Sequence, residues 1–362
     1  MKHLVPFVLA ALLGWTGCDP DEAPAGPGAC TSALSQETLL AATADNVILP
    51  AYENLQLATA ALQAAKAAFL DQPDKERLAT LRAAHDAAYE SWQAAEPFQF
   101  GPADEWFLRS SFNNFPLDQA AFDRQLNGDG FDFGGPDNYD KGLPALDYLL
   151  YHKGSVPATV DYLQTTPNAL SFLEAQVDDL QRRASAVLTA WREGYREQFV
   201  ANTGTAAGTG LSLLINRLNA HYESIKRERL GIPAGVLTIG IANPTRVEAY
   251  HSDRSLLLAE RALLASRQLY TGGTGAGMDD YLSELDNPEA AALNKEILDR
   301  YEAALTAVRS LDGSLSELVE TEQAAVTEAY AEVTRQLVYT KTDLPALTCV
   351  SITYIDNPSD SD

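Results

Sequence analysis

Apolar residues recur at helical spacing along almost the whole chain, on a background rich in alanine. Between residues 35 and 70 they return every three, four or seven positions, which places them on one face of a helix, and alanine favours that conformation. Comparable stretches cover residues 74–96, 167–200, 210–229, 244–269, 288–311 and 314–339. Because no run of alternating β-branched residues predicts a strand, we expect an all-α protein of two packed antiparallel helical bundles.

A small polar segment, Asn202–Gly210, divides the predicted helices into two groups. We expect an N-terminal bundle over residues 35–201, a C-terminal bundle over 211–350 and an acidic tail over 351–362. The sequences GLPA (Gly142–Ala145) and GIPA (Gly231–Ala234) form a faint internal repeat. If the repeat is real, the two turns meet where the bundles pack, which is a usual place for a ligand cleft.

The first residues predict export. Residues 1–17 combine Lys2 with a short apolar run and small residues, as a signal peptide does, and the run is too short to span a bilayer. The junction before Cys18 resembles a bacterial lipobox, with Trp15 where leucine is usual, so Cys18 is the predicted lipidation site. Residues 18–34 then form a flexible tether. The alternative is a secreted protein without lipid.

Two cysteines remain after Cys18, and exported proteins commonly pair such cysteines. We expect a disulfide between Cys30 and Cys349, with two unpaired thiols as the alternative.

The chain carries 26 Lys and Arg against 50 Asp and Glu, a formal charge of −24. A protein with this charge repels phosphate groups, so nucleic acid is excluded as a partner. Most of the acidic residues are expected to coat the bundles, where they are solvated.

The sequence lacks the HExxH, P-loop, dinucleotide-binding and GxSxG motifs. The segment 127–140 is rich in Asp, Asn and Gly and offers oxygen ligands for calcium, although its spacing is not that of the twelve-residue calcium loop, and a solvated turn is favoured. A second candidate metal site is the pair Glu248 and His251. These two residues lie three positions apart, as in some metal-binding helices. A surface pair in a helix beginning near Pro244 is the favoured alternative.

Several segments resemble the imelysin family of exported bacterial proteins, which includes lipoproteins associated with iron uptake. In chain order these are NVILPAYENL (Asn46–Leu55), SWQAAEPFQFGP (Ser91–Pro102), NFPLD (Asn114–Asp118), GLPALDYLLY (Gly142–Tyr151) and RLGIPAGVLTIGIANPTRVEAY (Arg229–Tyr250). The resemblance covers nearly all of the chain after the tether. It implies an all-α fold and a cleft.

The resemblance also implies a set of site residues. In the family signature G-x-H-x-x-E, this chain has Pro144 in place of His and Asp147 in place of Glu, so no catalytic residue is assigned. The expected ligand-binding residues are Glu96, Asp118, Gly142, Pro144, Asp147 and Arg229, with Glu96 and Asp147 as candidate metal ligands. The alternative is structural: Pro144 and Asp147 begin a helix and Asp118 caps one.

Three functions follow, in order of preference. The first is a non-catalytic lipoprotein of the cell envelope, at the outer membrane or periplasmic face, that binds iron or an iron complex. A TonB-dependent outer-membrane transporter is its expected partner. The second is a metallopeptidase of the imelysin type. The third is a helical surface module that binds a protein or polysaccharide, with Trp92, Trp106 and Tyr151 as stacking faces.

Overall fold

The computed structural model describes residues 30–135 and 138–354. The predicted signal peptide, Cys18, and most of the tether and acidic tail lie outside these residues. Within them the backbone is helical, with no strand and one isolated bridge between Ser32 and Leu285. The predicted all-α class is therefore confirmed.

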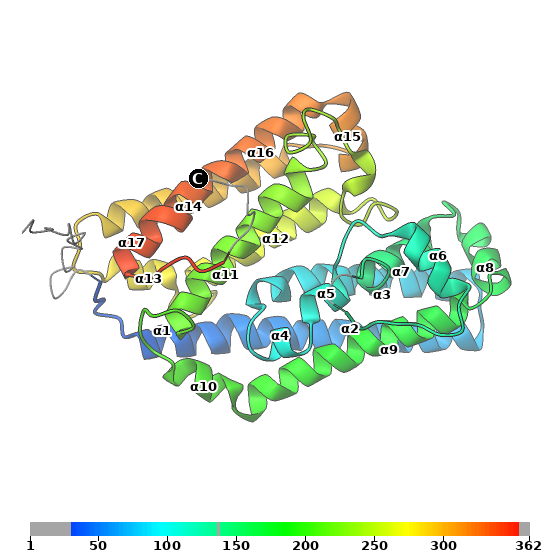
Figure 1. Cartoon of the computed structure of the whole chain (residues 1–362), viewed down its shortest axis with the longest axis horizontal. Coiled ribbons are helices and arrows are strands. Elements are labelled where there is room, and N and C mark those ends of the chain that lie inside the picture. The colour runs from blue at the N-terminus through cyan, green and yellow to red at the C-terminus, as the bar shows by residue number, and fades with distance from the viewer. Residues whose placement is uncertain (1–29, 136–137, 355–362) are drawn as a thin grey trace, which may run out of the picture.

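The helices form two packed bundles (Figure 1). The first half contains α1 (Gln36–Thr43), α2 (Leu49–Asp71), α3 (Lys75–Ala95), α4 (Pro102–Glu105), α5 (Leu108–Phe112), α6 (Gln119–Leu126), α7 (Gly142–Tyr151), α8 (Val156–Thr165), α9 (Ala169–Ala190) and α10 (Arg196–Ala201). The second contains α11 (Gly210–Ser224), α12 (Ser255–Thr271), α13 (Met278–Ser283), α14 (Ala290–Arg309), α15 (Leu315–Thr321), α16 (Gln323–Leu337) and α17 (Leu344–Thr348). Helices α2, α3 and α9 pack together in the first bundle, and α11, α12, α14 and α16 in the second.

Local chemistry sets the helix boundaries. The Ser35 hydroxyl accepts the Thr38 N–H at the start of α1, and Asp74 accepts the Arg77 N–H at the start of α3. Pro50 lies in the first turn of α2, after a π-helical turn over residues 44–48, because proline cannot donate to the preceding turn. The predicted helical run is thus interrupted beside this proline.

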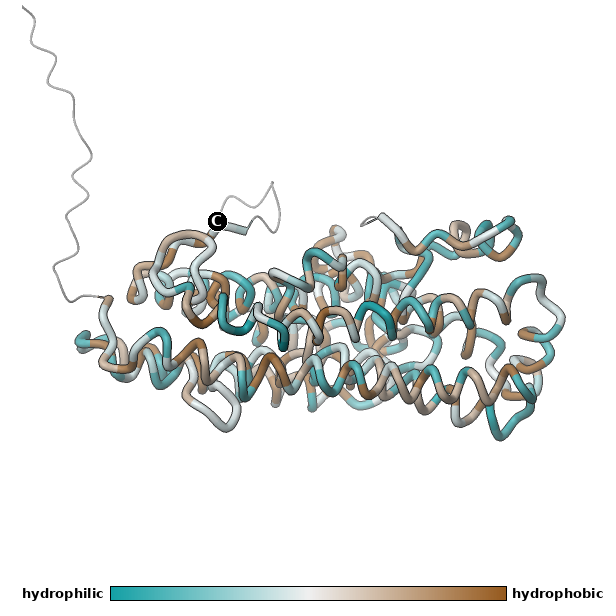
Figure 2. The backbone as a smooth tube through the Cα atoms, turned by 90° about the horizontal axis from the view of Figure 1, so that it is seen from below, coloured by the Kyte–Doolittle hydropathy of each residue, from teal (hydrophilic) through white to brown (hydrophobic). Residues whose placement is uncertain are grey.

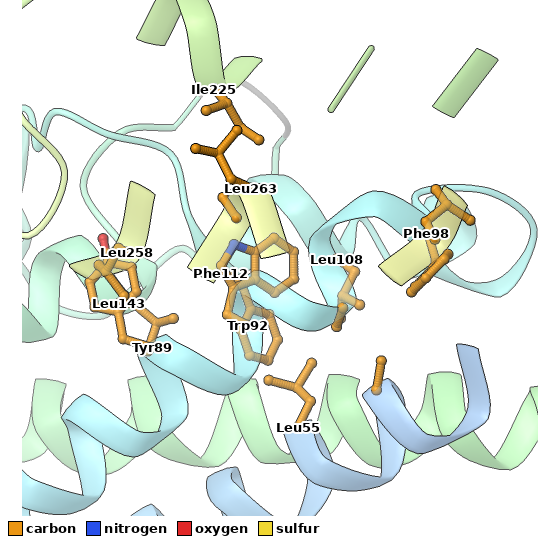
Figure 3. Packing of buried hydrophobic residues seen from close by; sticks show 14 of the residues in the cluster. Leu55, Tyr89, Trp92, Phe98, Leu108, Phe112, Leu143, Ile225, Leu258 and Leu263 are labelled. Carbon is orange, nitrogen blue, oxygen red and sulfur yellow. The ribbon is translucent and has the colours of Figure 1, made fainter. Parts of the chain in front are cut away.

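One hydrophobic core extends through both bundles, and α3 contacts α12 across the junction. Trp92 of α3 stacks on Phe112, with ring centroids 5.0 Å apart, and Leu258 and Leu263 of α12 lie in the same packed region (Figure 3). Brown and teal stretches alternate along the helices, as expected when each helix buries one face (Figure 2). The bundles therefore share buried surface, which fixes the residues at their junction.

Cys30 and Cys349 are joined by a disulfide, with Cα atoms 5.8 Å apart. The bond ties the segment before α1 to the end of α17. No described helix is both long enough and apolar enough to span a membrane.

Candidate functional site

A buried arginine lies between two buried glutamates at the junction of the bundles. The Arg229 guanidinium donates to Glu96 through Nη2 (2.5 Å) and to Glu248 through Nε (2.7 Å). All three residues are at most 2% exposed. Because an unpaired buried charge is strongly unfavourable, each of these side chains depends on the others.

Polar uncharged side chains complete the cluster. Gln93 Nε2 donates to Glu248 (2.9 Å), and its Oε1 accepts from Arg229 Nη2 (2.9 Å). Asn113 Nδ2 donates to the same Glu248 oxygen (2.7 Å) and accepts from the Tyr89 hydroxyl (2.9 Å). The donors and acceptors around the two carboxylates thus form one connected network.

Both halves of the chain supply this network. Tyr89 and Gln93 lie four residues apart on one face of α3, and Glu96 begins the short 3-10 turn that follows. Arg229 lies in a π-helical turn over residues 225–231, directly after α11. The charged cluster therefore links the end of α3 to the end of α11.

A second arginine neutralises the outer side of the cluster. Arg109 donates to Glu96 (3.2 Å) and to Glu228 (2.7 Å). The Ser224 hydroxyl donates to Glu228 (2.9 Å) and accepts from Arg229 (3.2 Å). Glu228 is thus already engaged by its own cation.

The two central glutamates differ in acidity. Burial opposes ionisation of Glu96, but the positive charges of Arg229 and Arg109 hold its pKa well below the ordinary value. For Glu248 burial outweighs the attraction of Arg229, so its pKa is raised. Burial likewise opposes the charge of Arg229, but the two carboxylates raise its pKa. Glu96 is therefore the more acidic of the two glutamates, and Glu248 is the more readily protonated.

His221 of α11 adds a neutral imidazole to the cluster. Its Nε2 lies 3.7 Å from Glu96 Oε2, and neither ring nitrogen has a hydrogen-bond partner among the described residues. Burial lowers the pKa of His221, although the Glu96 carboxylate opposes this effect. Burial therefore favours the uncharged form of the ring.

Two adjoining cavities open next to this cluster. The larger has a volume of about 510 Å³ and lies between residues 115–119, the start of α7 and residues 243–251. The other has a volume of about 440 Å³ and is bounded by residues 115–118 and 227–232, with Tyr139 and Arg246. Phe115 lines both cavities, and its ring centroid is 5.7 Å from the Arg229 guanidinium carbon. The cleft wall thus contacts the buried cluster directly.

Asp147 of α7 lies at the edge of the larger cavity and is buried. Its carboxylate accepts the backbone N–H groups of His251 (2.9 Å) and Ser252 (3.0 Å). Burial raises the pKa of Asp147, although the nearby histidines and the hydrogen bonds oppose the shift. Asp147 therefore fixes the segment 243–252 against α7, and it does not lie in the first turn of that helix as the structural alternative assumed.

The other predicted site residues have mixed positions. Pro144 lines the larger cavity and Asp118 the smaller one. Asp118 also caps α6 by accepting the Ala121 N–H (2.9 Å). Gly142 has a φ of +78° and begins α7, and a Cβ there would lie 2.5 Å from the Phe112 carbonyl oxygen. Gly142 thus positions α7 without facing either cavity.

The predicted helix over residues 244–269 is wrong in its first part, because α12 begins only at Ser255. Residues before it form a 3-10 turn, Pro244–Arg246, and further turns in which Ala249 and Asp253 have positive φ. The favoured surface pair of Glu248 and His251 is also wrong. Glu248 is buried and forms an ion pair with Arg229, and the backbone around it consists of turns.

Glu96 and Asp147, the candidate metal ligands, lie in separate hydrogen-bond networks. Glu96 accepts from two arginines, and Asp147 accepts from two backbone amides. Asp147 lines the larger cavity, whereas Glu96 lines neither. In the described part of the chain no group of three or more His, Cys, Asp and Glu side chains is placed to hold a metal ion.

The loop considered for calcium contains its own cation. Lys141 Nζ donates to the backbone carbonyls of Phe133 (3.1 Å), Gly134 (2.9 Å) and Gly135 (2.6 Å). Burial lowers the pKa of Lys141. These carbonyls therefore bind the ammonium group of the buried Lys141.

The three aromatic residues considered for polysaccharide binding do not form a free stacking surface. Trp92 is in the core, stacked on Phe112. Arg182 covers the Trp106 ring at 5.3 Å, and Arg82 covers the Tyr151 ring at 4.7 Å. These faces are therefore occupied within the chain.

The sequence argument missed Gln93 and Glu248 as partners of Arg229, and it missed Asn113 as a partner of Glu248. Gln93 did carry a usable signal, because it is a polar residue on the apolar face of α3 between Tyr89 and Glu96. Nothing comparable marks Glu248, whose position depends on turns that no periodicity predicts.

The chain is similar in sequence to a family of known proteins. The sequence profile described as imelysin, peptidase family M75, matches residues 48–340. The chain is 23% identical over 261 residues to iron-regulated protein A of Synechococcus elongatus, covering 68% of each protein.

Two solved structures share the fold. A candidate iron-regulated protein A precursor from Parabacteroides distasonis superposes with a TM-score of 0.67 and 18% identity, covering 87% of this chain and 98% of that one. An imelysin-like protein from Psychrobacter arcticum superposes with a TM-score of 0.70 and 16% identity, covering 90% and 99%. With the profile match spanning most of its length, this chain belongs to the imelysin family.

Proposed function

We propose that this protein is an exported, lipid-anchored binding protein that holds iron or an iron complex in the cleft between its bundles and does not hydrolyse peptides. The observation that carries the proposal is the cleft itself. Its walls come from both halves of the chain, and Phe115 connects them to the buried Glu96–Arg229–Glu248 cluster. Concave sites at such junctions are typical ligand sites.

Iron as the cargo is supported by the relatives. One curated relative and one structural neighbour bear the name iron-regulated protein A. The larger cavity is also lined by Tyr148 and His251, which carry oxygen and nitrogen atoms of the kind that iron accepts.

A binding role is favoured over hydrolysis by the groups that line the cleft. Pro144 stands where the family signature has an imidazole, and it has neither a ligand nor a base to offer. Asp147 already accepts two backbone N–H groups, so its carboxylate is committed to holding the cleft wall. A general base must be free to reach a water molecule.

The calorimetric test uses the purified mature chain with ferrous iron, ferric citrate and haem. Saturable binding of at least one of these, together with higher expression under iron limitation, is the expected result. The proposal is abandoned if none of the three ligands binds and the expression level of the protein does not change under iron limitation.

Attachment to the envelope through Cys18 is tested separately. Labelled fatty acid is expected to appear in the wild-type protein and to be absent from Cys18→Ser, which should be released from the membrane fraction. A complex with an outer-membrane transporter, the proposed receiver of the cargo, is expected to be captured by cross-linking in iron-limited cells.

The name of the matching profile favours metallopeptidase activity as a second candidate. Mass spectrometry of a peptide mixture, with and without chelator, distinguishes the two functions. Cleavage that the chelator abolishes would establish the peptidase.

A further inference from the structure

We propose that the cargo enters the cleft as an anionic chelate with carboxylate oxygens, held by Arg227 and Arg246, and not as a bare metal ion. This inference rests on the proposed function and names the chemical class of its ligand. The juxtaposition that carries it is two arginines on the wall of one cavity, neither of which has a side-chain hydrogen bond or ion pair among residues 30–135 and 138–354.

Both arginines come from irregular segments of the second half. Arg227 lies in the π-helical turn over residues 225–231, two residues before Arg229, and Arg246 ends the 3-10 turn that begins at Pro244. In the described residues neither guanidinium makes an ion pair or a hydrogen bond, although the chain has almost twice as many acidic as basic residues. Their neighbours Arg109 and Arg229, by contrast, each contact two carboxylates.

The acids that share the cavity do not neutralise these two arginines. Glu228 is engaged by Arg109 and by the Ser224 hydroxyl. Asp118 accepts the Ala121 N–H at the start of α6. The wall of the smaller cavity therefore contains two guanidinium groups without an ion pair among the described residues, whereas Glu228 in the same wall is paired with Arg109.

The position of Arg246 extends this charge to the larger cavity. Arg246 lines both cavities, together with Phe115, Pro116 and Leu117. A ligand that bridges the cavities thus meets guanidinium groups and the Phe115 ring at the same time.

Guanidinium chemistry selects the ligand class. The planar fork of arginine binds carboxylates through two parallel hydrogen bonds, and it repels a free cation. A chelate whose carboxylates exceed the charge of its metal is attracted instead. The chelate's own oxygens coordinate the metal, so the cleft does not have to supply a full set of metal ligands, and the described residues hold no such set.

The test compares four proteins by calorimetry with ferric citrate: wild type, Arg227→Gln, Arg246→Gln and the double variant. Each single change should weaken binding about tenfold and the double change about a hundredfold, as expected for charge-assisted hydrogen bonds. Arg124→Gln is the matched control, because Arg124 is an exposed arginine that likewise has no ion-pair partner among the described residues and lines neither cavity. It should bind like wild type, and unchanged melting temperatures exclude misfolding.

Three further probes separate this inference from the proposed function. They are aqueous ferrous iron, an uncharged ferric hydroxamate and iron-free citrate. If aqueous ferrous iron or the ferric hydroxamate binds as tightly as ferric citrate, and the arginine substitutions do not change its affinity, the anionic ligand class is wrong but iron binding stands. If iron-free citrate binds equally well and depends on the arginines, the anion site stands and iron as cargo is wrong. If no probe binds, both are overturned.

Discussion

At the scale of single residues, Arg229 determines how the two bundles can meet. Its guanidinium lies within 2.7 Å of oxygens from Glu96 and Glu248, which come from opposite halves of the chain. Removing a cation that two buried acids share leaves uncompensated buried charge, which strongly destabilises the folded state. The cluster is thus a condition for the cleft to exist, and it need not touch the ligand.

Arg229→Gln should therefore lower the free energy of unfolding by about 3–5 kcal/mol, the cost of leaving buried charges unpaired. Arg227→Gln is the control from the same turn, where a cation without a partner is removed, and it should change stability by less than about 0.5 kcal/mol. Urea titrations of the two variants give both values. Equal stabilities would show that the cluster does not hold the junction.

His221 makes stability depend on pH. Its folded pKa is lowered by burial, whereas in the unfolded chain it has the ordinary value of 6.5. Below that pH the unfolded chain binds a proton at this histidine and the folded chain does not. The free energy of unfolding therefore falls as the pH drops, by at most about 1.4 kcal/mol per pH unit for one proton.

The variant His221→Phe isolates this contribution, because the histidines at 152 and 251, whose pKa values are also lowered, remain in both proteins. Urea midpoints measured between pH 7.5 and 5.5 should fall less steeply for the variant. Parallel curves would mean that the buried ring does not resist protonation.

At the scale of elements, long helices were predictable and the turns that build the site were not. Helix α14 spans Ala290–Arg309 where apolar periodicity predicted 288–311, since burial of one face dominates such helices. The conformation of the segment before Ser255 depends on tertiary contacts instead. The Asp147 carboxylate accepts a backbone N–H group of this segment, and Arg229 donates to its Glu248 side chain. Glu96 and Arg229 were predictable from family resemblance, but their pairing required the fold.

The start of α7 gives a prediction at this scale. Gly142→Ala should destabilise the protein by about 3 kcal/mol or more, because strained φ is combined with overpacking against the Phe112 carbonyl. Gly154→Ala is a matched control with a φ of +70° and open space around the Cβ position, so strain alone should give about 1 kcal/mol. Thermal unfolding compares the two. A loss at Gly142 no larger than that at Gly154 would argue against a close approach of α7 and α5.

At the scale of the whole molecule, one disulfide closes nearly the entire described chain. Cys30 and Cys349 are 319 residues apart. The predicted all-α class was right because the burial of one face of each helix is encoded by the local spacing of apolar residues. The cleft depends on how the two bundles pack against each other. Local patterns in a single sequence do not predict contacts between helices that are far apart along the chain.

Replacing both cysteines by serine should lower the free energy of unfolding substantially, with about 6 kcal/mol as the upper value that chain entropy allows for so long a loop. Calorimetric melting of oxidised wild type, reduced wild type and the double variant measures the effect. The reduced wild type and the double variant should have the same melting temperature, below that of the oxidised wild type. Equal melting temperatures for all three would show that the disulfide does not contribute to stability.

The central claim is that the cleft between the bundles is where iron is held. Crystals of the protein soaked with ferric citrate, measured at the iron absorption edge, locate the metal directly by anomalous scattering. The account predicts one strong peak between Arg246, Asp147 and His251, beside Phe115. A peak outside the cleft, or no peak in crystals of a protein that binds the complex in solution, would contradict it.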